Sequence, residues 1–122
     1  RNLCNNNVFL ICDKFHVKEV IKNLMRNSLE SIQHQKGKVM VETTIDQEKI
    51  NINVKDNGIG ISSNNLVKVR DPFFTTKKDK LNFGLGLSYC LRIMHYHGGD
   101  LMITSKEGKG TTVSLIFLKT RI

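Results

Sequence analysis

The stretch INVKDNGIG, residues 52–60, decides the fold because it joins a strand pattern directly to a polar loop with two glycines. Apolar and polar residues alternate up to Asp56, which predicts a half-buried strand. Asn57-Gly58 alone would favour a hairpin turn, but residues 62–65 are only Ser and Asn, so no clear partner strand follows within hairpin distance. The glycines would instead let the backbone pass close to a flat ring, while the Asp56 carboxylate accepts a hydrogen bond from an exocyclic amino group.

Outward from this stretch, five segments have the alternation or the short apolar run of a strand. They are residues 8–12, 39–45, 50–55, 101–105 and 111–118. The second and third are expected to pair through a turn at 46–48. The last two are expected to form a closing β-hairpin through the glycine-containing segment 106–110.

Two amphipathic helices complete the predicted elements. From His16 to about His34, apolar residues recur at steps of three and four, and Gly37 follows as a stop signal. The second helix begins near Gly84 and ends at residues 97–99. Residues 56–83, between the predicted strands and this helix, are rich in Asn, Gly, Ser and Lys and show little periodicity beyond one possible turn of helix. Long irregular segments of this kind are typical of functional lids, so we expect a mobile lid.

Composition limits the classes of function. The 122 residues fit one domain, residues 1–122, and no apolar run is long enough to span a membrane. The 19 Lys and Arg against 11 Asp and Glu give a formal charge of +8, which favours polyanions such as nucleic acid, anionic lipid or a nucleotide phosphate. The cations are scattered and only 7% of residues are aromatic, unlike a nucleic-acid reader. Three cysteines without a CxxC pair suggest neither a zinc site nor a disulfide framework, and fit a reducing compartment.

Asn23 and Asn27 lie four residues apart on the first predicted helix, so their side chains project from one face, one turn apart. They lie beside the apolar stripe, where two amides could face a groove. An amide oxygen suits Mg²⁺, which takes few protein ligands when phosphates supply the rest. An isolated pair with this spacing is more often an ordinary polar helix edge, and both interpretations stay open on these two residues alone.

The run FGLGLS, residues 83–88, places two glycines at the start of the second predicted helix. The free N–H groups and the positive end of the helix dipole bind anions there, and glycine lets a phosphate approach the backbone. The run is neither a dinucleotide-binding fingerprint nor a P-loop, because it lacks both G-x-G-x-x-G and Gly-Lys-Ser/Thr. By itself the glycine pair is a weak signal for phosphate.

The features follow one another in a distinctive order: an amide-bearing helix, a strand, D-x-G-x-G, a segment with Phe-Phe, G-x-G at a helix start, and a hairpin with Gly-Thr-Thr. This order resembles the Bergerat fold, the nucleotide-binding fold of sensor histidine kinases, gyrase B and the mismatch-repair ATPases, over residues 8–118. The histidine kinases are the most similar. Their N, G1, F and G2 boxes match residues 19–30, 56–60, 71–77 and 84–88.

The resemblance implies an α+β fold, a two-layer sandwich in which a mixed, mostly antiparallel sheet of about five strands packs on about three helices, with a mobile ATP lid. It implies ATP and Mg²⁺ as cofactors. Asn27 would coordinate Mg²⁺, Asn23 would lie near the phosphates as its catalytic companion, and Asp56 would accept from the adenine amino group. The other residues that the resemblance assigns to ATP binding are Arg26, Gly58, Gly60, Ile61, Lys77, Lys78, Phe83, Gly84, Leu85, Gly86, Leu87 and Thr111.

Asn23 stands where the hydrolytic relatives carry a water-activating Glu, and an amide cannot accept a proton from water. The resemblance therefore implies a protein-histidine kinase that passes the γ-phosphoryl group to an imidazole on a separate dimerisation domain, for onward transfer to a response regulator. No histidine here is followed by the acidic residue typical of an acceptor, so the acceptor domain is expected before Arg1. Two positions depart from the family pattern: Asn82 replaces a frequent Gly, and Glu30 replaces a Lys found in some members.

The alternative is a catalytically silent nucleotide-binding module that regulates a partner. In either case we expect the isolated domain to be monomeric, cytoplasmic and without a nucleic-acid partner. A kinase domain of this kind is expected to be inactive without its acceptor domain. Its parent protein would be either soluble or membrane-anchored.

Overall fold

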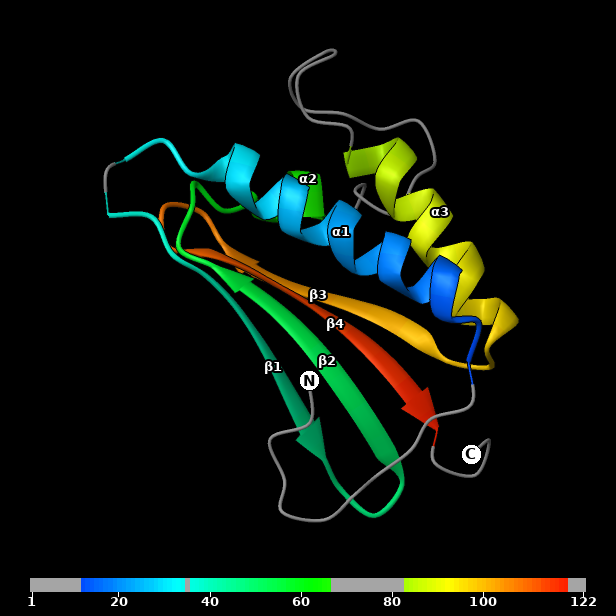
Figure 1. Cartoon of the computed structure of the whole chain (residues 1–122). Coiled ribbons are helices and arrows are strands. Elements are labelled where there is room, and N and C mark those ends of the chain that lie inside the picture. Colours follow the sequence, from blue (N-terminus) through cyan, green and yellow to red (C-terminus); the bar gives the residue numbers. More distant parts are fainter. Residues whose placement is uncertain (1–11, 35, 67–82, 119–122) are drawn as a thin grey trace.

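The computed structural model describes residues 12–34, 36–66 and 83–118. In chain order the elements are α1 (Lys14–Ser31), β1 (Val39–Ile45), β2 (Lys49–Asp56), α2 (Ser63–Leu66), α3 (Phe83–Tyr96), β3 (Asp100–Lys106) and β4 (Gly110–Leu118). The strands form one antiparallel sheet in the order β1-β2-β4-β3, and α1 and α3 cover one of its faces (Figure 1). The predicted α+β sandwich is confirmed.

The sheet and the helical layer are somewhat smaller than predicted. Over the described residues there are four strands and two long helices, with α2 adding a single turn. Every strand pairing in this part of the chain is antiparallel rather than mixed. The predicted strand at 8–12 lies outside the described residues except for Cys12, which is not in a strand, and most of the predicted lid, residues 67–82, lies outside them as well.

Helix α1 begins at an aspartate cap and changes character along its length. The Asp13 side chain accepts a hydrogen bond from the His16 backbone N–H at 3.1 Å, which satisfies one of the free donors of the first turn. The helix ends three residues earlier than predicted, because Ile32 adopts an extended backbone. Its buried residues are Val17, Val20, Leu24, Asn27, Ser28 and Ser31. The first half of this stripe therefore builds the core, and the second half brings polar groups inside.

The core lies between the two long helices and the sheet. Its most deeply buried side chains are Val20, Leu24, Val54, Leu87, Cys90, Met94, Leu101, Leu115 and Phe117. Removing each large apolar side chain from water contributes roughly 1.5–3 kcal/mol, so this layer supplies most of the driving force for folding. No helix in the described part of the chain is both long and apolar enough to cross a membrane.

The two long helices run in opposite directions, and a histidine joins their ends. The Asp13 backbone N–H donates to His97 Nε2 at 2.8 Å, so the His97 proton is on Nδ1, which lies 2.8 Å from the Ile93 carbonyl oxygen. This joins the beginning of α1 to the end of α3. The first turn of α3 consequently lies toward the second half of α1, where Asn23 and Asn27 are located (Figure 1).

Candidate functional site

Three polar side chains form a row at one end of the sheet. Asp56, the last residue of β2, pairs with Thr111 on β4, which pairs in turn with Ser105 on β3. Directly opposed residues point to the same face, and here that is the face covered by the helices. Residues of the row also line part of a hollow of about 380 Å³ at the β3–β4 hairpin, but this hollow is lined as well by Thr104 and Thr112, which alternate with Ser105 and Thr111 and so point to the opposite face. The register thus brings together Asp56 and Thr111, two of the residues predicted to contact a nucleotide base.

The loop after β2 is held against both α1 and the β3–β4 hairpin. The Gly58 N–H donates to Asp56 Oδ1 at 2.9 Å, and the Ile59 N–H donates to the Ser31 carbonyl at 3.0 Å. From the other side, the Gly108 N–H donates to the Ile59 carbonyl at 2.7 Å. The loop that follows Asp56 therefore has a defined position relative to the end of α1 and to the hairpin.

Both glycines of this loop are required by close contacts with protein atoms. A Cβ on Gly58 would lie 2.2 Å from Ser31 Oγ, and one on Gly60 would lie 2.2 Å from the Lys106 carbonyl oxygen. Gly60 also has a φ of +72°, in the left-handed region that glycine adopts without strain. The sequence predicts close approach to a flat ring, and the close neighbours that the structure shows are α1 and the end of β3.

Asn57 anchors the loop instead of forming a hairpin turn. Its Oδ1 accepts from the Lys38 N–H at 2.7 Å, and its Nδ2 donates to the Lys36 carbonyl at 2.9 Å. The side chain thereby ties the loop to the segment that precedes β1. Sequence reasoning treated Asn57 only as a turn signal, since the partners of an anchoring side chain lie 19 and 21 residues away.

Ser105 is a second polar residue that sequence reasoning missed. The Ile61 N–H donates to its Oγ at 2.8 Å, the Gly110 carbonyl oxygen lies 2.9 Å from it, and Thr111 Oγ1 lies 2.7 Å from it. Ser105 thus joins the loop after β2 to the hairpin that carries Thr111. The alternating register of that hairpin, read outward from its glycine-containing turn, would have placed Ser105 opposite Thr111.

The amides of α1 lie near this loop. Asn27 is only 9% exposed and belongs to the same buried stripe as Ser31, one helical turn further on, which contacts Gly58. Asn23 is partly buried, and its Oδ1 accepts a hydrogen bond from Arg26 at 3.3 Å. Two of the predicted phosphate-side residues are therefore on the face of α1 that the sequence indicated, and Arg26 is exposed beside them.

The predicted phosphate-binding run coincides with the first turn of α3. The helix begins at Phe83, so the backbone of Gly84, Leu85 and Gly86 lies where helical N–H groups lack intrahelical partners. Leu87 is 1% exposed and packs in the core, so only its backbone is available to a ligand. The predicted lid cations, Lys77 and Lys78, lie outside the described residues.

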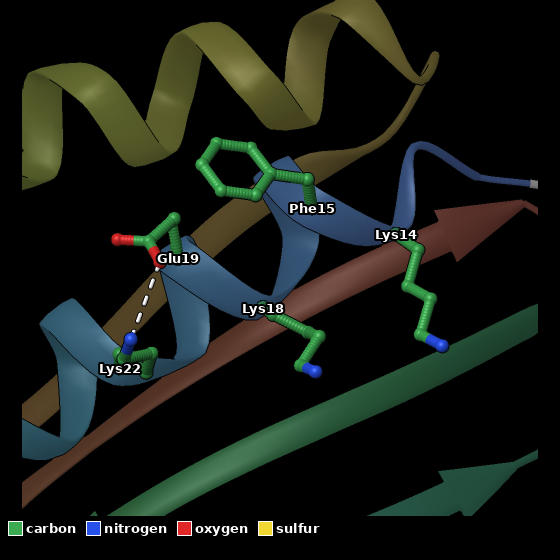
Figure 2. Close-up of a pocket in the computed structure, with 5 residues that line it drawn as sticks. All are labelled: Lys14, Phe15, Lys18, Glu19 and Lys22. Carbon is green, nitrogen blue, oxygen red and sulfur yellow. Dashed lines mark hydrogen bonds and ion pairs between the residues drawn. The ribbon is translucent and has the colours of Figure 1, made fainter.

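A second hollow, of about 470 Å³, lies beside the first half of α1 and is lined by Lys14, Phe15, Lys18, Glu19 and Lys22. In Figure 2 the side chains of Phe15 and Glu19 point toward the side on which α3 lies, whereas Lys14 and Lys18 point away from it. Lys22 is 3.3 Å from Glu19. None of the residues predicted to bind ATP lines this hollow, so part of the positive charge of the chain lies away from the polar row.

Comparison with known proteins agrees with the fold and with the order of these features. The profile of the histidine kinase-, DNA gyrase B- and HSP90-like ATPase family matches residues 12–122. Sporulation kinase D of Bacillus subtilis is 39% identical over 104 residues, which are 85% of this chain and 20% of that protein. The sensor histidine kinase WalK of the same organism is 32% identical over 120 residues, 93% of this chain and 20% of that protein.

Among solved structures, the nucleotide-free catalytic domain of the histidine kinase ThkA superposes with a TM-score of 0.74 at 30% identity, covering 88% of this chain and 70% of that one. The chain spans only about a fifth of the length of the two curated relatives above. The family match, the kinase relatives and the shared fold together show that the chain belongs to the histidine kinase-, DNA gyrase B- and HSP90-like ATPases, as an ATP-binding catalytic domain of the sensor histidine kinase type.

Proposed function

We propose that this chain binds Mg·ATP and transfers the γ-phosphoryl group to a histidine on a separate dimerisation and acceptor domain, from which the group passes to a response regulator. The observation that carries the proposal is the row of Asp56, Thr111 and Ser105 on the helix-covered face, next to the loop of Gly58 and Gly60, which we take as the base pocket. Asp56 Oδ1 holds the loop through Gly58, and its Oδ2 is the proposed acceptor for the adenine amino group.

The phosphates would extend from this base pocket toward α1 and the first turn of α3. The free amides of Gly84, Leu85 and Gly86 are suited to bind the phosphate oxygens. Arg26, and the predicted lid cations Lys77 and Lys78, would offset their negative charge. In this arrangement the chain contributes mainly positioning and charge stabilisation, which dominate catalysis of phosphoryl transfer.

The residues present fit a magnesium ion that is held mainly by the nucleotide. Asn27 offers an amide oxygen from a largely buried position, and Mg²⁺ commonly takes one or two protein oxygens together with phosphates and water. Over the described residues no group of three His, Cys, Asp or Glu side chains could hold a metal ion. We therefore assign the ion to Asn27 and the phosphate oxygens, where it would neutralise charge on the β- and γ-phosphates.

A kinase is favoured over a hydrolase by the chemistry of Asn23. Its amide cannot take a proton from water, and its Oδ1 already accepts a hydrogen bond from Arg26. At this position on α1 the proposed site would therefore hold ATP without a base that activates water. An incoming imidazole needs no strong base, because its neutral nitrogen is itself the nucleophile.

The direct test mixes this chain with acceptor-domain fragments of histidine kinases and γ-labelled ATP. We expect a phosphorylated acceptor whose label is lost in acid and retained in base, as for phosphohistidine. At an ATP concentration below the Kd of the unaltered chain, Asp56→Asn should lower the labelling by about tenfold or more. A chain that binds ATP but labels none of the acceptors would instead support the silent regulatory module.

A further inference from the structure

We infer that Ser105 determines which purine base the site accepts, by holding the Thr111 hydroxyl as a hydrogen-bond acceptor. The inference rests on the proposed function, because it places the base of the nucleotide against Asp56 and Thr111. It starts from the three hydrogen bonds around Ser105 Oγ, to Ile61 N, Gly110 O and Thr111 Oγ1.

The direction of each hydrogen bond follows from what its partner can do. A serine hydroxyl has one proton to donate and two lone pairs that accept. The Ile61 N–H can only donate, so it uses one lone pair of Ser105 Oγ. The Gly110 carbonyl can only accept, so it takes the Ser105 proton. The contact with Thr111 at 2.7 Å then has one possible direction, in which Thr111 donates to the second lone pair of Ser105.

This leaves Thr111 with lone pairs only for any further partner. The Thr111 side chain is 7% exposed, and burial makes the loss of a hydrogen bond costly, so its hydroxyl is held in this orientation. Asp56, beside it in the register, is a carboxylate and also offers only acceptors. Asp56 and Thr111 therefore present two hydrogen-bond acceptors to the base, and the hydrogen bond to Ser105 keeps the Thr111 hydroxyl in this orientation.

Two adjacent acceptors distinguish between purines at position 6. Adenine carries an amino group there, whose two protons match two acceptors. Hypoxanthine and guanine carry a carbonyl oxygen there, which offers no proton to either acceptor, and their neighbouring N1–H supplies one proton for two acceptors. A site that leaves polar groups unpaired in this way discriminates strongly against the mismatched ligand. Ser105 itself contacts none of these bases in our account. It orients Thr111, so it acts as a positioning residue.

The test compares the affinities of ATP and ITP, which differ only at this edge of the base, by calorimetry on the 122-residue chain. We expect the unaltered chain to prefer ATP by about tenfold or more. Ser105→Ala frees the Thr111 hydroxyl to rotate and donate, so the preference should fall by roughly tenfold. Ser105→Thr keeps the hydroxyl and should retain the preference.

A double-mutant cycle separates this role from a merely structural one. In a Thr111→Val background there is no hydroxyl to orient, so Ser105→Ala should leave the ratio of ATP to ITP affinity unchanged. An equal change of that ratio in both backgrounds would overturn the inference. If Ser105→Ala does not fold, Thr111→Val alone decides: it should lower the preference for ATP, and an unchanged preference contradicts the account.

The outcomes also separate this inference from the function on which it rests. If the unaltered chain binds ATP and ITP equally well, or keeps its preference in Ser105→Ala, the role of Ser105 is wrong and the ATP site remains. If the unaltered chain binds neither nucleotide, the proposed function is wrong, and the role of Ser105 is wrong with it.

Discussion

Asp56 and Ser105 show, residue by residue, what sequence can and cannot predict. Asp56 was predicted as a site residue because its position after a strand and before two glycines is visible along the chain. Ser105 was not, because its three partners belong to separate segments that meet only when β3, β4 and the loop after β2 are assembled. Motif spacing identifies side chains that contact a ligand more readily than those that orient them.

Asn27 is the residue whose predicted role is most specific. We expect Asn27→Ala to weaken ATP binding in the presence of Mg²⁺ by roughly tenfold or more, because the amide oxygen is the proposed protein ligand of the ion. Without Mg²⁺, in excess EDTA, the variant should bind ATP with nearly the same affinity as the unaltered chain. Calorimetric titration under both conditions measures this, and equal losses with and without Mg²⁺ would count against the metal role.

Cys90 should make the stability of the domain depend on pH under alkaline conditions. Burial raises the pKa of its thiol from 9.0 to about 12. Between these values the unfolded chain loses the thiol proton while the folded chain keeps it, so the free energy of unfolding falls as pH rises. The Cys90 contribution to this fall is at most about 1.4 kcal/mol per pH unit.

Urea denaturation of the unaltered chain and of Cys90→Ala checks this. At neutral pH the variant should be less stable by about 1–2 kcal/mol, because it leaves a small cavity. The gap between the two proteins should narrow as the pH is raised above 9.0. A gap that stays constant would show that the pKa of the thiol is the same in the folded and unfolded states.

At the scale of elements, the sequence patterns predicted which segments form helices or strands better than they predicted where each element begins and ends. The strand expected at 50–55 extends over Lys49–Asp56, because β1 and β4 pair with it on both sides and carry the ladder as far as Asp56. This extension makes Asp56 a strand residue in register with Thr111. The turn at 46–48 is confirmed, and Asp46 Oδ1 stabilises it by accepting from the backbone N–H groups of Glu48 and Lys49.

The contact between the loop after β2 and the hairpin can be tested with a matched pair of glycines. Gly60 and Gly108 both have φ in the left-handed region, at +72° and +82°, but a Cβ would collide with a carbonyl oxygen only at Gly60. Gly108→Ala should cost about 1 kcal/mol for its backbone conformation alone. Gly60→Ala should cost clearly more, by roughly a further 1–3 kcal/mol, and should weaken ATP binding.

Thermal unfolding of both variants measures the difference in stability, and calorimetry measures nucleotide affinity. Equal destabilisation by the two alanines would mean that the loop can move away from Lys106 at little cost. In that case the loop would not have the defined position on which the base pocket depends.

For the whole molecule, the polar row and the motifs account for only a small part of the net charge of +8. Lys14, Lys18 and Lys22 lie along the first half of α1, beside a hollow that none of the predicted ATP-binding residues lines (Figure 2). Composition favoured a polyanionic ligand but did not indicate which kind, because the net charge does not show where on the molecule the charged side chains lie. In the proposed site, the arrangement of Asp56, Thr111 and Asn27 favours a nucleotide.

The isolated chain should turn ATP over very slowly. Asn23 provides no base to activate water, and none of the described residues is positioned as a phosphate acceptor in our account. We expect phosphate release near the rate of a buffer blank and no stable label on the chain itself. Steady release of phosphate in a coupled assay, lost in Asp56→Asn, would indicate a hydrolase instead of a kinase.

Calorimetric titration of Mg·ATP into the unaltered chain, Asp56→Asn and Asp46→Asn tests the central claim most directly. The two variants make the same change of charge, and the Asn at position 56 can still accept from Gly58 N–H. Asp46 lies in the turn at the opposite end of β2. We predict that Asp56→Asn lowers ATP affinity by about tenfold or more, while Asp46→Asn leaves it unchanged. Unchanged affinity in Asp56→Asn would contradict the site.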